Sequence, residues 1–293
     1  MKIFKRLFNL YKVCSLKEFF YILYHFFITK QLVINNPVLH RVLIFVIACT
    51  DKNYLLSLQE GNIIQIEGLP HGAKFLVRKY TRDLLVFEGF FISDDYTSYI
   101  EEIQTSSSKV NLVIDAGANI GCSCIFFQVF FPHSTIICIE PELSNYSMLQ
   151  KNINLNRIND KVKVYRKALW NEKTTLALRR IDYSNDGFHT MVEGTTDEVI
   201  DSVATCTIPE ILDDLQVAVV DVLKIDIEGA EKTLFNDQAH LHSFLPQVRY
   251  CIMEVHNEYI SDKQIEMSFK EFGFHTKTIT LTGQPSAIVA HKY

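Results

Sequence analysis

The sequence predicts an α/β fold with a doubly wound, mostly parallel sheet. Apolar runs of strand length alternate with helical patterns, a glycine turn follows one of the runs, and acidic side chains end several of them. The first half of the alternation places strands at 111–116, 135–140 and 162–169, separated by helices at 120–131 and 144–155. Such alternation favours parallel strands that are covered by helices on both faces.

Residues 171–206 interrupt the alternation. We expect strands at 174–179 and 199–206, on either side of a polar loop that contains Asp186-Gly187-Phe188-His189. Long loops beside a ligand crevice often carry substrate recognition, so this loop is a predicted substrate-binding segment.

The alternation resumes after Cys206. Capping boxes mark two helix starts, Thr207 with Glu210 and Ser261 with Gln264, and Ser144 suits the N-cap of the helix at 144–155. The predicted elements are helix 209–216, strand 218–227, helices 229–236 and 238–245, strand 248–255, helix 262–272, and a terminal hairpin of strands 276–281 and 287–291 around Thr282-Gly283-Gln284-Pro285-Ser286.

Two further segments precede this region. The predicted domains are an aromatic-rich helical segment (1–60), a lead-in of short strands and a helix (61–108) and the main domain (109–293). Alternating apolar residues between Gly61 and Phe91, among them Leu84, Val86 and Phe87, predict short antiparallel strands. A helix over Asp94 to Ser106 then leads into the main domain.

The N-terminal segment is unusually rich in aromatic residues. They are Phe4, Phe8, Tyr11, Phe19, Phe20, Tyr21, Tyr24, Phe26 and Phe27. Three interpretations stay open: a helical cap packed on the rest of the chain, a helix that binds a membrane surface or a partner, and disorder. Basic residues beside aromatic side chains are typical of membrane interfaces.

Composition narrows the class of protein. The chain has 293 residues, a net charge of −5 and a pI near 6.1, which disfavours nucleic acid as a partner. Its seven cysteines are scattered singly and indicate a reducing compartment. No apolar stretch reaches the roughly 18–20 residues needed to span a bilayer. We therefore expect a cytoplasmic protein, with peripheral membrane contact through the N-terminal segment as the open alternative.

The turn after the first predicted strand indicates a nucleoside site. Asp115, Gly117 and Gly121 lie where the strand passes into a helix, and glycine lets the backbone turn sharply and approach a ligand. The next strand ends in Glu140, which is placed to accept both hydroxyls of a ribose.

The spacing of the glycines indicates which nucleoside is bound. A dinucleotide fingerprint requires Gly-x-Gly-x-x-Gly, but Asn119 stands two positions after Gly117, and the spacing is Gly-x-x-x-Gly. Asp115 would repel a pyrophosphate, whereas it suits a ligand with an ammonium and a sulfonium group. S-adenosyl-L-methionine fits this charge pattern better than NAD.

A third segment identifies a family. Val220 to Glu231 reads as a strand that ends in clustered carboxylates and a glycine. Together with the Asp115 turn, Glu140-Pro141, Ala168-Leu169 and Met253-Glu254-Val255-His256, it makes the chain resemble the FkbM-type S-adenosylmethionine-dependent methyltransferases from about Arg78 onward. The resemblance implies the seven-stranded class I methyltransferase (Rossmann-like) sheet with its terminal hairpin. It also implies O-methylation of a sugar, glycolipid or secondary metabolite.

Site residues follow from this resemblance and from strand parity. The predicted cofactor-binding residues are Asp115, Gly117, Asn119, Gly121, Glu140, Ala168, Leu169 and Asp226. Arg166 and Lys167 depart from the family pattern, in which a small polar or acidic residue precedes the adenine-sheltering strand tip. Trp170 fits either stacking on the adenine or a place in the core.

The predicted catalytic residues lie at two neighbouring strand ends. Asp226, Glu254 and His256 should converge on one crevice, with His256 as the first candidate for the general base and Asp226 as the second. Lys224, in a buried strand, should pair with a carboxylate. A divalent cation at Asp226, Glu228 and Glu254 is the weaker alternative, and no metal is predicted. Glu231 fits a role at a helix N-terminus.

Two other function classes stay open. One is a nucleotide-binding accessory protein without turnover, which would never convert S-adenosylmethionine to S-adenosylhomocysteine. The other is an NAD-dependent oxidoreductase, against which the missing Gly-x-Gly-x-x-Gly argues. The expected partner is a small-molecule or glycan acceptor, and the sequence gives no oligomeric state.

Overall fold

The computed structural model describes residues 2–25, 36–93, 95–106, 109–180, 189–190, 199–279 and 286–292. The chain forms two compact units, Met1–Thr97 with Asn154–Asn156, and Ser98–Ile153 with Arg157–Tyr293. The domain boundaries expected near residues 60 and 108 stay predictions.

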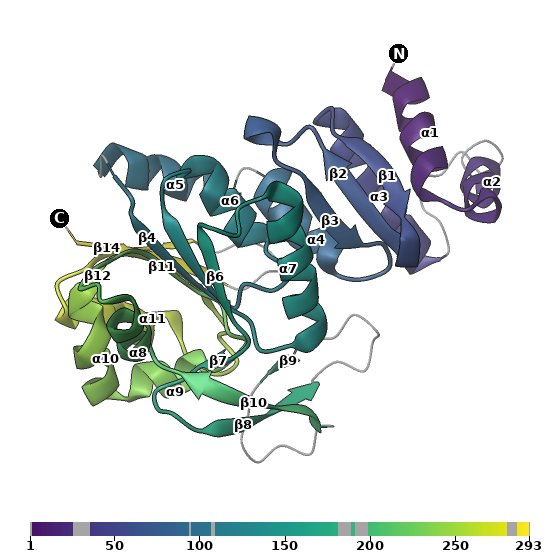
Figure 1. Cartoon of the computed structure of the whole chain (residues 1–293). Coiled ribbons are helices and arrows are strands. Elements are labelled where there is room, and N and C mark those ends of the chain that lie inside the picture. Colours follow the sequence, from purple (N-terminus) through teal and green to yellow (C-terminus); the bar gives the residue numbers. More distant parts are fainter. Residues whose placement is uncertain are drawn as a thin grey trace. The chain divides into compact units, whose positions relative to one another are not determined.

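The first unit combines helices with a small antiparallel sheet (Figure 1). Its elements are α1 (Lys2–Val13), α2 (Leu16–Tyr24), α3 (Pro37–Asp51), β1 (Leu55–Gln59), η2 (Glu60–Asn62), β2 (Ile63–Glu67), η3 (Pro70–Gly72), β3 (Phe75–Arg78) and α4 (Asp83–Phe91). The strand order is β1-β2-β3. The rings of Phe45 and Phe75 lie 5.8 and 5.6 Å from that of Phe87 and form its aromatic core. The helices predicted before residue 50 are confirmed over the described residues.

One prediction for this unit is wrong. Leu84, Val86 and Phe87 lie in helix α4 and not in a strand. The carboxylate of Asp83, the first residue of α4, accepts hydrogen bonds of 2.8 Å from the backbone N–H and the guanidinium of Arg78. Leu84 and Phe87, three positions apart, then share the buried face of the helix. Strand β1 lies before the segment in which strands were expected.

The second unit contains the predicted seven-stranded sheet. Its elements are α5 (Asp95–Ser106), β4 (Leu112–Ala116), α6 (Cys122–Phe130), β5 (Thr135–Ile139), α7 (Leu143–Asn156), β6 (Val162–Tyr165), β7 (Ala168–Leu169), β8 (Thr175–Arg180), β9 (His189–Thr190), β10 (Val199–Cys206), α8 (Ile208–Leu215), β11 (Val220–Ile225), α9 (Glu231–Asn236), α10 (Gln238–Phe244), η4 (Leu245–Gln247), β12 (Val248–Val255), α11 (Asp262–Glu271), β13 (His275–Ile279) and β14 (Ser286–His291).

The sheet has the order β13-β14-β12-β11-β4-β5-β6. The strands from β12 to β6 pair in parallel, and β14 is antiparallel to both of its neighbours. Helices α6 and α7 lie on one face, and α8, α10 and α11 lie on the other (Figure 1). The α/β prediction is confirmed, including the terminal hairpin. Of its predicted turn at 282–286 and of the predicted loop at 186–189, residues 282–285 and 186–188 lie outside the described residues. Ser286 begins β14, and His189 lies in β9 and not in a loop.

The prediction of a single strand at 162–169 is wrong, because this segment forms two strands, β6 and β7. β6 ends the main sheet, whereas β7 pairs in parallel with β10 in a separate sheet of order β7-β10-β8-β9. Between them Arg166 forms an ion pair with Asp201 of β10. This contact accompanies the departure of the chain from the main sheet toward the smaller one.

The helix starts are confirmed in part. Thr207 and Glu210 form both hydrogen bonds of the predicted capping box. Ser144 is not an N-cap, because α7 has already begun at Leu143. The carboxylate of Glu142 accepts the backbone N–H groups there instead, with a distance of 2.9 Å to that of Ser144.

Only one of the two hydrogen bonds of the predicted capping box at α11 is present. Ser261 Oγ accepts the N–H of Gln264, at 3.4 Å. The side-chain oxygen of Gln264 does not accept the N–H of the N-cap, and its NH₂ group donates to the side chain of Asn236 at 2.7 Å.

Candidate active site

The glycine turn between β4 and α6 leaves no room for a side chain. Gly117 has φ 77°, and a Cβ at this position would lie 1.7 Å from the carbonyl oxygen of Asp226. Gly121 has φ 93°, and its Cβ would lie 2.6 Å from Leu149 Cδ1. Asn119, between them, also adopts the left-handed region, with φ 50°. The turn therefore brings its backbone close to the loop after β11, which only glycine permits at Gly117.

Glu140, the predicted ribose ligand, is held by this turn. Its carboxylate accepts the backbone N–H of Asn119 at 2.8 Å and that of Glu142 at 2.9 Å. Burial raises the pKa of Glu140 to about 7, although these two hydrogen bonds act in the opposite direction. A carboxylate offers about four lone-pair positions. The N–H groups of Asn119 and Glu142 and the side chain of Asn145 occupy three of them, which leaves one for a ribose hydroxyl.

Lys224 makes the carboxylate contacts that its place in a buried strand predicts. Its Nζ lies 3.2 Å from Asp226 Oδ2, 3.2 Å from the carbonyl oxygen of Gly117 and 3.5 Å from Asp115 Oδ1. Asp115 is fully buried and accepts a hydrogen bond of 2.5 Å from Ser123. Burial raises the pKa of Asp115, against the effects of Lys224 and Ser123. Asp115 thus supports the turn from inside, and its direct contact with a cofactor stays a prediction.

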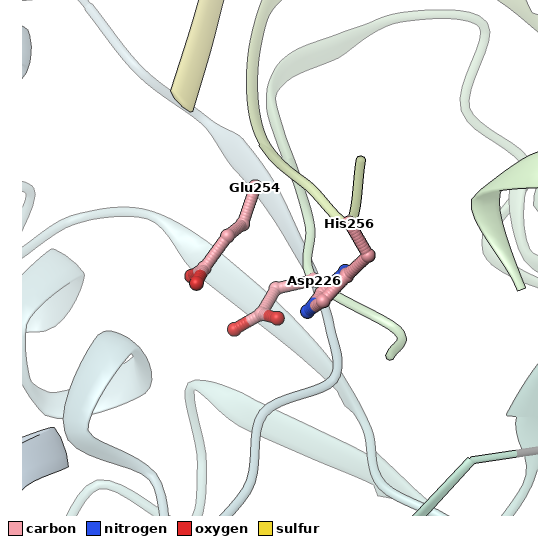
Figure 2. Close-up of side chains that lie close together, drawn as sticks. All are labelled: Asp226, Glu254 and His256. Atoms are coloured by element: carbon pink, nitrogen blue, oxygen red, sulfur yellow. The ribbon is translucent and has the colours of Figure 1, made fainter. Parts of the chain in front are cut away.

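The three predicted catalytic residues lie together. In the parallel register Ile225 of β11 faces Met253 of β12, so the next residues, Asp226 and Glu254, emerge side by side. Figure 2 shows Asp226 between Glu254 and His256. One ligand atom from each lies within 4.8 Å of the others. The sequence prediction that they converge is confirmed.

His256 is bound by carboxylates at both ring nitrogens. Nδ1 lies 3.0 Å from Glu231 Oε1, and Nε2 lies 3.2 Å from Glu228 Oε2. Burial favours the neutral ring, but the bonds to Glu228 and Glu231 outweigh it and raise the pKa of His256 to about 11. The ring is therefore a cation at neutral pH, with both N–H groups already donated. This geometry does not favour the sequence prediction of His256 as a general base.

Sequence reasoning did not identify the role of Glu231. Its fully buried carboxylate accepts the N–H of Ile227 at 3.0 Å and that of Gly229 at 2.7 Å, besides contacting His256. It thereby fixes the turn that follows Asp226. The available signal was a glutamate two residues after a glycine, at a helix start, which indicated only a helix-terminal charge.

Glu254 is the half-buried carboxylate of the group. Within the described part of the chain, its side chain forms neither a hydrogen bond nor an ion pair. Burial, and then the neighbouring charge of Asp226, raise the pKa of Glu254 to about 8, against the effects of His256 and Lys224. This pKa suits a group that exchanges a proton near neutral pH.

The predicted adenine-side residues have their side chains in the core. Ala168 and Leu169 are buried in β7, and Trp170 follows them in the same hydrophobic cluster. Of the two interpretations of Trp170, a place in the core is therefore the one observed. Contact of Ala168 and Leu169 with an adenine stays a prediction.

Asp226, Glu254 and His256 are also residue types that bind metal ions. Two of them are already engaged with charged groups of the chain: Asp226 with Lys224, and His256 with two carboxylates. An ammonium 3.2 Å from Asp226 competes with a metal for the same carboxylate. The arrangement therefore favours positioning and proton transfer over metal binding.

Comparisons with known proteins identify the family of the domain. Residues 115–276 match the Methyltransferase FkbM domain. The chain is 25% identical over 139 residues to "Methyltransferase 1" of Beauveria bassiana (strain ARSEF 2860), a match that covers 41% of this chain and 55% of that protein. The chain thus spans about half the length of this curated relative.

One solved structure shares the fold, and a second is reported for its ligand. The METTL16 MTase domain (crystal form 2) superposes with a TM-score of 0.50 and 12% identity, over 89% of this chain and 85% of that one. M. capricolum TrmK, in complex with S-adenosyl-homocysteine, gives a TM-score of 0.40 and 7% identity, over 66% of this chain and 67% of that one. At these identities the likeness concerns the fold alone.

Proposed function

The chain belongs to the FkbM methyltransferase domain family, whose match covers more than half of its residues, and we propose that it methylates a hydroxyl oxygen. The family implies S-adenosyl-L-methionine as the cofactor, as the sequence predicted. When bound, this cofactor supplies a methyl group on a positively charged sulfur. The acceptor that we propose is a small molecule or glycan, namely a sugar, a glycolipid or a secondary metabolite.

The residues at the strand tips suit a positively charged donor. Beside its bonds from Asn119, Glu142 and Asn145, Glu140 keeps one lone-pair position for a ribose hydroxyl. Asp115 and Asp226 surround Lys224, and Glu228 and Glu231 surround His256. Four carboxylates thus face two cations, and this excess of negative charge attracts a sulfonium and an ammonium. We assign the methionine end to the turn of Asp115, Gly117, Asn119 and Gly121 and to Asp226, and the adenine side to Ala168 and Leu169.

Glu254 is the general base in this proposal. The observation that carries it is a half-buried carboxylate at the end of β12, beside Asp226, whose side chain has no ion-pair partner among the described residues. The acceptor hydroxyl gives its proton to Glu254 while its oxygen would take the methyl group, whose bond to the sulfur of the bound cofactor would break and leave S-adenosylhomocysteine. Because Asp226 and His256 are ion-paired already, they position the reacting groups and do not exchange protons.

Positioning carries most of the barrier reduction. Holding the acceptor oxygen in line with the methyl group can supply on the order of 7–11 kcal/mol. Lys224 fixes the side chain of Asp226. Glu231 fixes the turn after Asp226 and the ring of His256, so these side chains are held in place before the acceptor binds. A general base adds about 10²–10⁴-fold in rate.

The test is a transfer assay with methyl-labelled S-adenosylmethionine. The acceptors are a panel of sugars, glycolipids and secondary metabolites, with RNA as a further arm. We expect label in an alkali-stable methyl ether. In Glu254→Gln the turnover number should fall about 10²–10⁴-fold, with little change in the dissociation constant for the cofactor.

Glu258→Gln is the matched control, because Glu258 is an exposed glutamate four residues along the same chain segment. It should keep full activity. Tight binding of S-adenosylmethionine without formation of S-adenosylhomocysteine, across all acceptors, would favour the accessory protein. Label in RNA alone would contradict the proposed acceptor class.

A further inference from the structure

Helix α1 carries an exposed aromatic stripe. Phe4, Phe8 and Tyr11 follow one another at spacings of four and three, so they lie on one face of the helix. Their side chains are 74%, 57% and 54% exposed. Lys5 and Lys12 follow Phe4 and Tyr11 and flank the stripe, and the Lys12 ammonium lies 4.6 Å from the centre of the Phe8 ring.

Helix α2 continues this surface. Its exposed large side chains are Leu16, Phe20, Tyr21 and Tyr24, of which Phe20 is 62% exposed. Ring contacts join the two helices, because Tyr11 meets Phe19 at 5.6 Å and Phe19 meets Phe20 at 5.7 Å between centroids. We name Phe4, Phe8, Tyr11, Leu16, Phe20, Tyr21 and Tyr24 the aromatic face.

Polar contacts fix the opposite sides of both helices. Arg6 of α1 forms an ion pair of 2.7 Å with Asp51, and the Asn9 amide donates to Thr50 at 3.0 Å. Glu18 of α2 accepts from the buried Lys79 at 2.8 Å. The orientation of each helix is therefore determined within the unit, with the aromatic face outward.

The charge around the aromatic face is strongly positive. Residues 1–25 contain five basic residues and one acidic residue, which gives +4, whereas the whole chain has −5. The remaining residues therefore carry −9. Arg6 and Glu18 are bound to partners within the unit, and Lys5, Lys12 and Lys17 are exposed beside the aromatic face. Exposed lysines around aromatic side chains, on a protein that is acidic as a whole, form a surface that is complementary to a partner with a negatively charged surface and an apolar interior.

We propose that the aromatic face binds the surface of an anionic lipid bilayer. Aromatic and aliphatic side chains enter the boundary between headgroups and acyl chains, while lysines pair with anionic headgroups. The contact that we propose is interfacial, because the aromatic residues occupy the outer face of two short helices whose other faces pack within the unit. Among the described helices, none has the length and hydropathy of a membrane span. It is independent of the methyl transfer proposed above.

Co-sedimentation of the full chain with vesicles tests this proposal. We expect binding to phosphatidylcholine vesicles that contain phosphatidylserine, weaker binding to phosphatidylcholine alone, and release by salt, because headgroup attraction is screened. Phe8→Ser with Phe20→Ser should weaken binding at least about tenfold. Lys5→Glu with Lys12→Glu should do so to a similar extent and remove the preference for phosphatidylserine.

Matched controls lie in the second unit. Met267 is 58% exposed and Lys232 is exposed, so Met267→Ser with Lys232→Glu changes one apolar and one basic surface side chain elsewhere. This variant should bind vesicles as the wild type does. Equal binding by the aromatic-face variants, or no binding of the wild type to any vesicle, would overturn the proposal. So would a wild-type dimer in light scattering that the Phe8 and Phe20 changes dissociate, without vesicle binding.

A depth measurement does not depend on disruptive variants. Trp170 is the single tryptophan and is buried, so Phe20→Trp adds one exposed reporter. Brominated phosphatidylserine vesicles should quench the added fluorescence and leave that of Trp170 unchanged. Absence of quenching, with the protein folded as wild type by circular dichroism, would reject insertion of the aromatic face.

Discussion

The strand tips of the second unit and the two helices that begin the first unit depart from ordinary burial in opposite directions. At the strand tips Asp115, Lys224 and Glu231 are charged and buried, whereas on α1 and α2 Phe4 and Phe20 are apolar and exposed. Buried charge and exposed apolar surface are the two informative exceptions to the burial rule. Each marks a place where stability alone does not explain the residue.

The two regions differ in where the missing partner comes from. At the strand tips the chain itself supplies it, because Lys224 pairs with Asp115 and Asp226, and Glu231 binds His256. On the aromatic face the partner, in our proposal, is a bilayer. The first arrangement gives a rigid site that is complete before ligands arrive, and the second gives a surface that depends on its surroundings.

Removing Lys224 should have the largest effect on stability. In Lys224→Met the carboxylate of Asp115 stays buried without its cation, and the expected loss is about 3–5 kcal/mol in the free energy of unfolding. Urea denaturation measures it. Adding Asp115→Asn should restore part of the loss, since the unpaired charge is then gone.

Lys232→Met is the control for this experiment, because Lys232 is an exposed lysine of α9. Its free energy of unfolding should change by less than about 0.5 kcal/mol. A loss below about 1 kcal/mol in Lys224→Met would show that the strand tips do not depend on an internal ion pair.

The ion pair between Glu18 of α2 and Lys79 should contribute less to the free energy of unfolding than Lys224 does. Glu18→Gln removes the carboxylate that pairs with the buried Lys79, and we expect a loss of about 2–3 kcal/mol, since Glu18 is itself partly exposed. Glu67→Gln is the matched control, because its ion pair with Lys74 lies at the surface and is worth about 0–1 kcal/mol.

The pH dependence of this loss has a definite sign. Burial opposes the charge of Glu18, but hydrogen bonds from Lys79, Ser15 and Tyr80 outweigh it and lower its pKa to about 2. The contribution is therefore complete above the unfolded pKa of about 4.3 and declines as pH falls toward 2. Thermal melts of wild type and Glu18→Gln should converge over this range. A constant difference would exclude the ion pair as the cause.

Much of the fold could be predicted because its pattern is local. Apolar runs and their acidic ends locate the strands of the main sheet, and parallel register then brings Asp226 and Glu254 together. The helix α4 could not be separated from a strand, because over so short a run Leu84 and Val86 fit the period of a strand while Leu84 and Phe87 fit that of a helix. The start of that helix at Asp83 depends on its contacts with Arg78.

The state of His256 could not be predicted because it depends on distant residues. Glu231 lies 25 positions earlier and contacts the ring only after the turn at Gly229 has formed. Which side of α1 faces outward could not be predicted either. Leu10 and Val13 face inward and Phe4 and Phe8 outward, so apolar residues occupy both sides and the sequence does not say which one is exposed.

The pH profile of transfer should sharpen the assignment at the strand tips. With cofactor saturating, kcat/KM requires ionised Glu254, whose pKa is raised to about 8. The rate should fall about tenfold per pH unit below that value and level off above it. In Glu254→Gln this slope should disappear. An inflection near 6.5 that His256→Asn removes would instead make His256 the base.

Chelation should have the smallest effect and tests whether the strand tips supply their own cations. Asp226 is paired with Lys224, and His256 carries its charge between Glu228 and Glu231, so both positions that a metal would occupy already hold a positive group. Preincubation with EDTA should change the transfer rate by less than about twofold, an effect below 0.5 kcal/mol. Added Mg²⁺ should not increase it. A large loss of transfer rate that Mg²⁺ restores would mean that a metal replaces Lys224 at Asp226 in the active enzyme. The strand tips would then also depend on a partner from outside the chain, as we propose for the aromatic face.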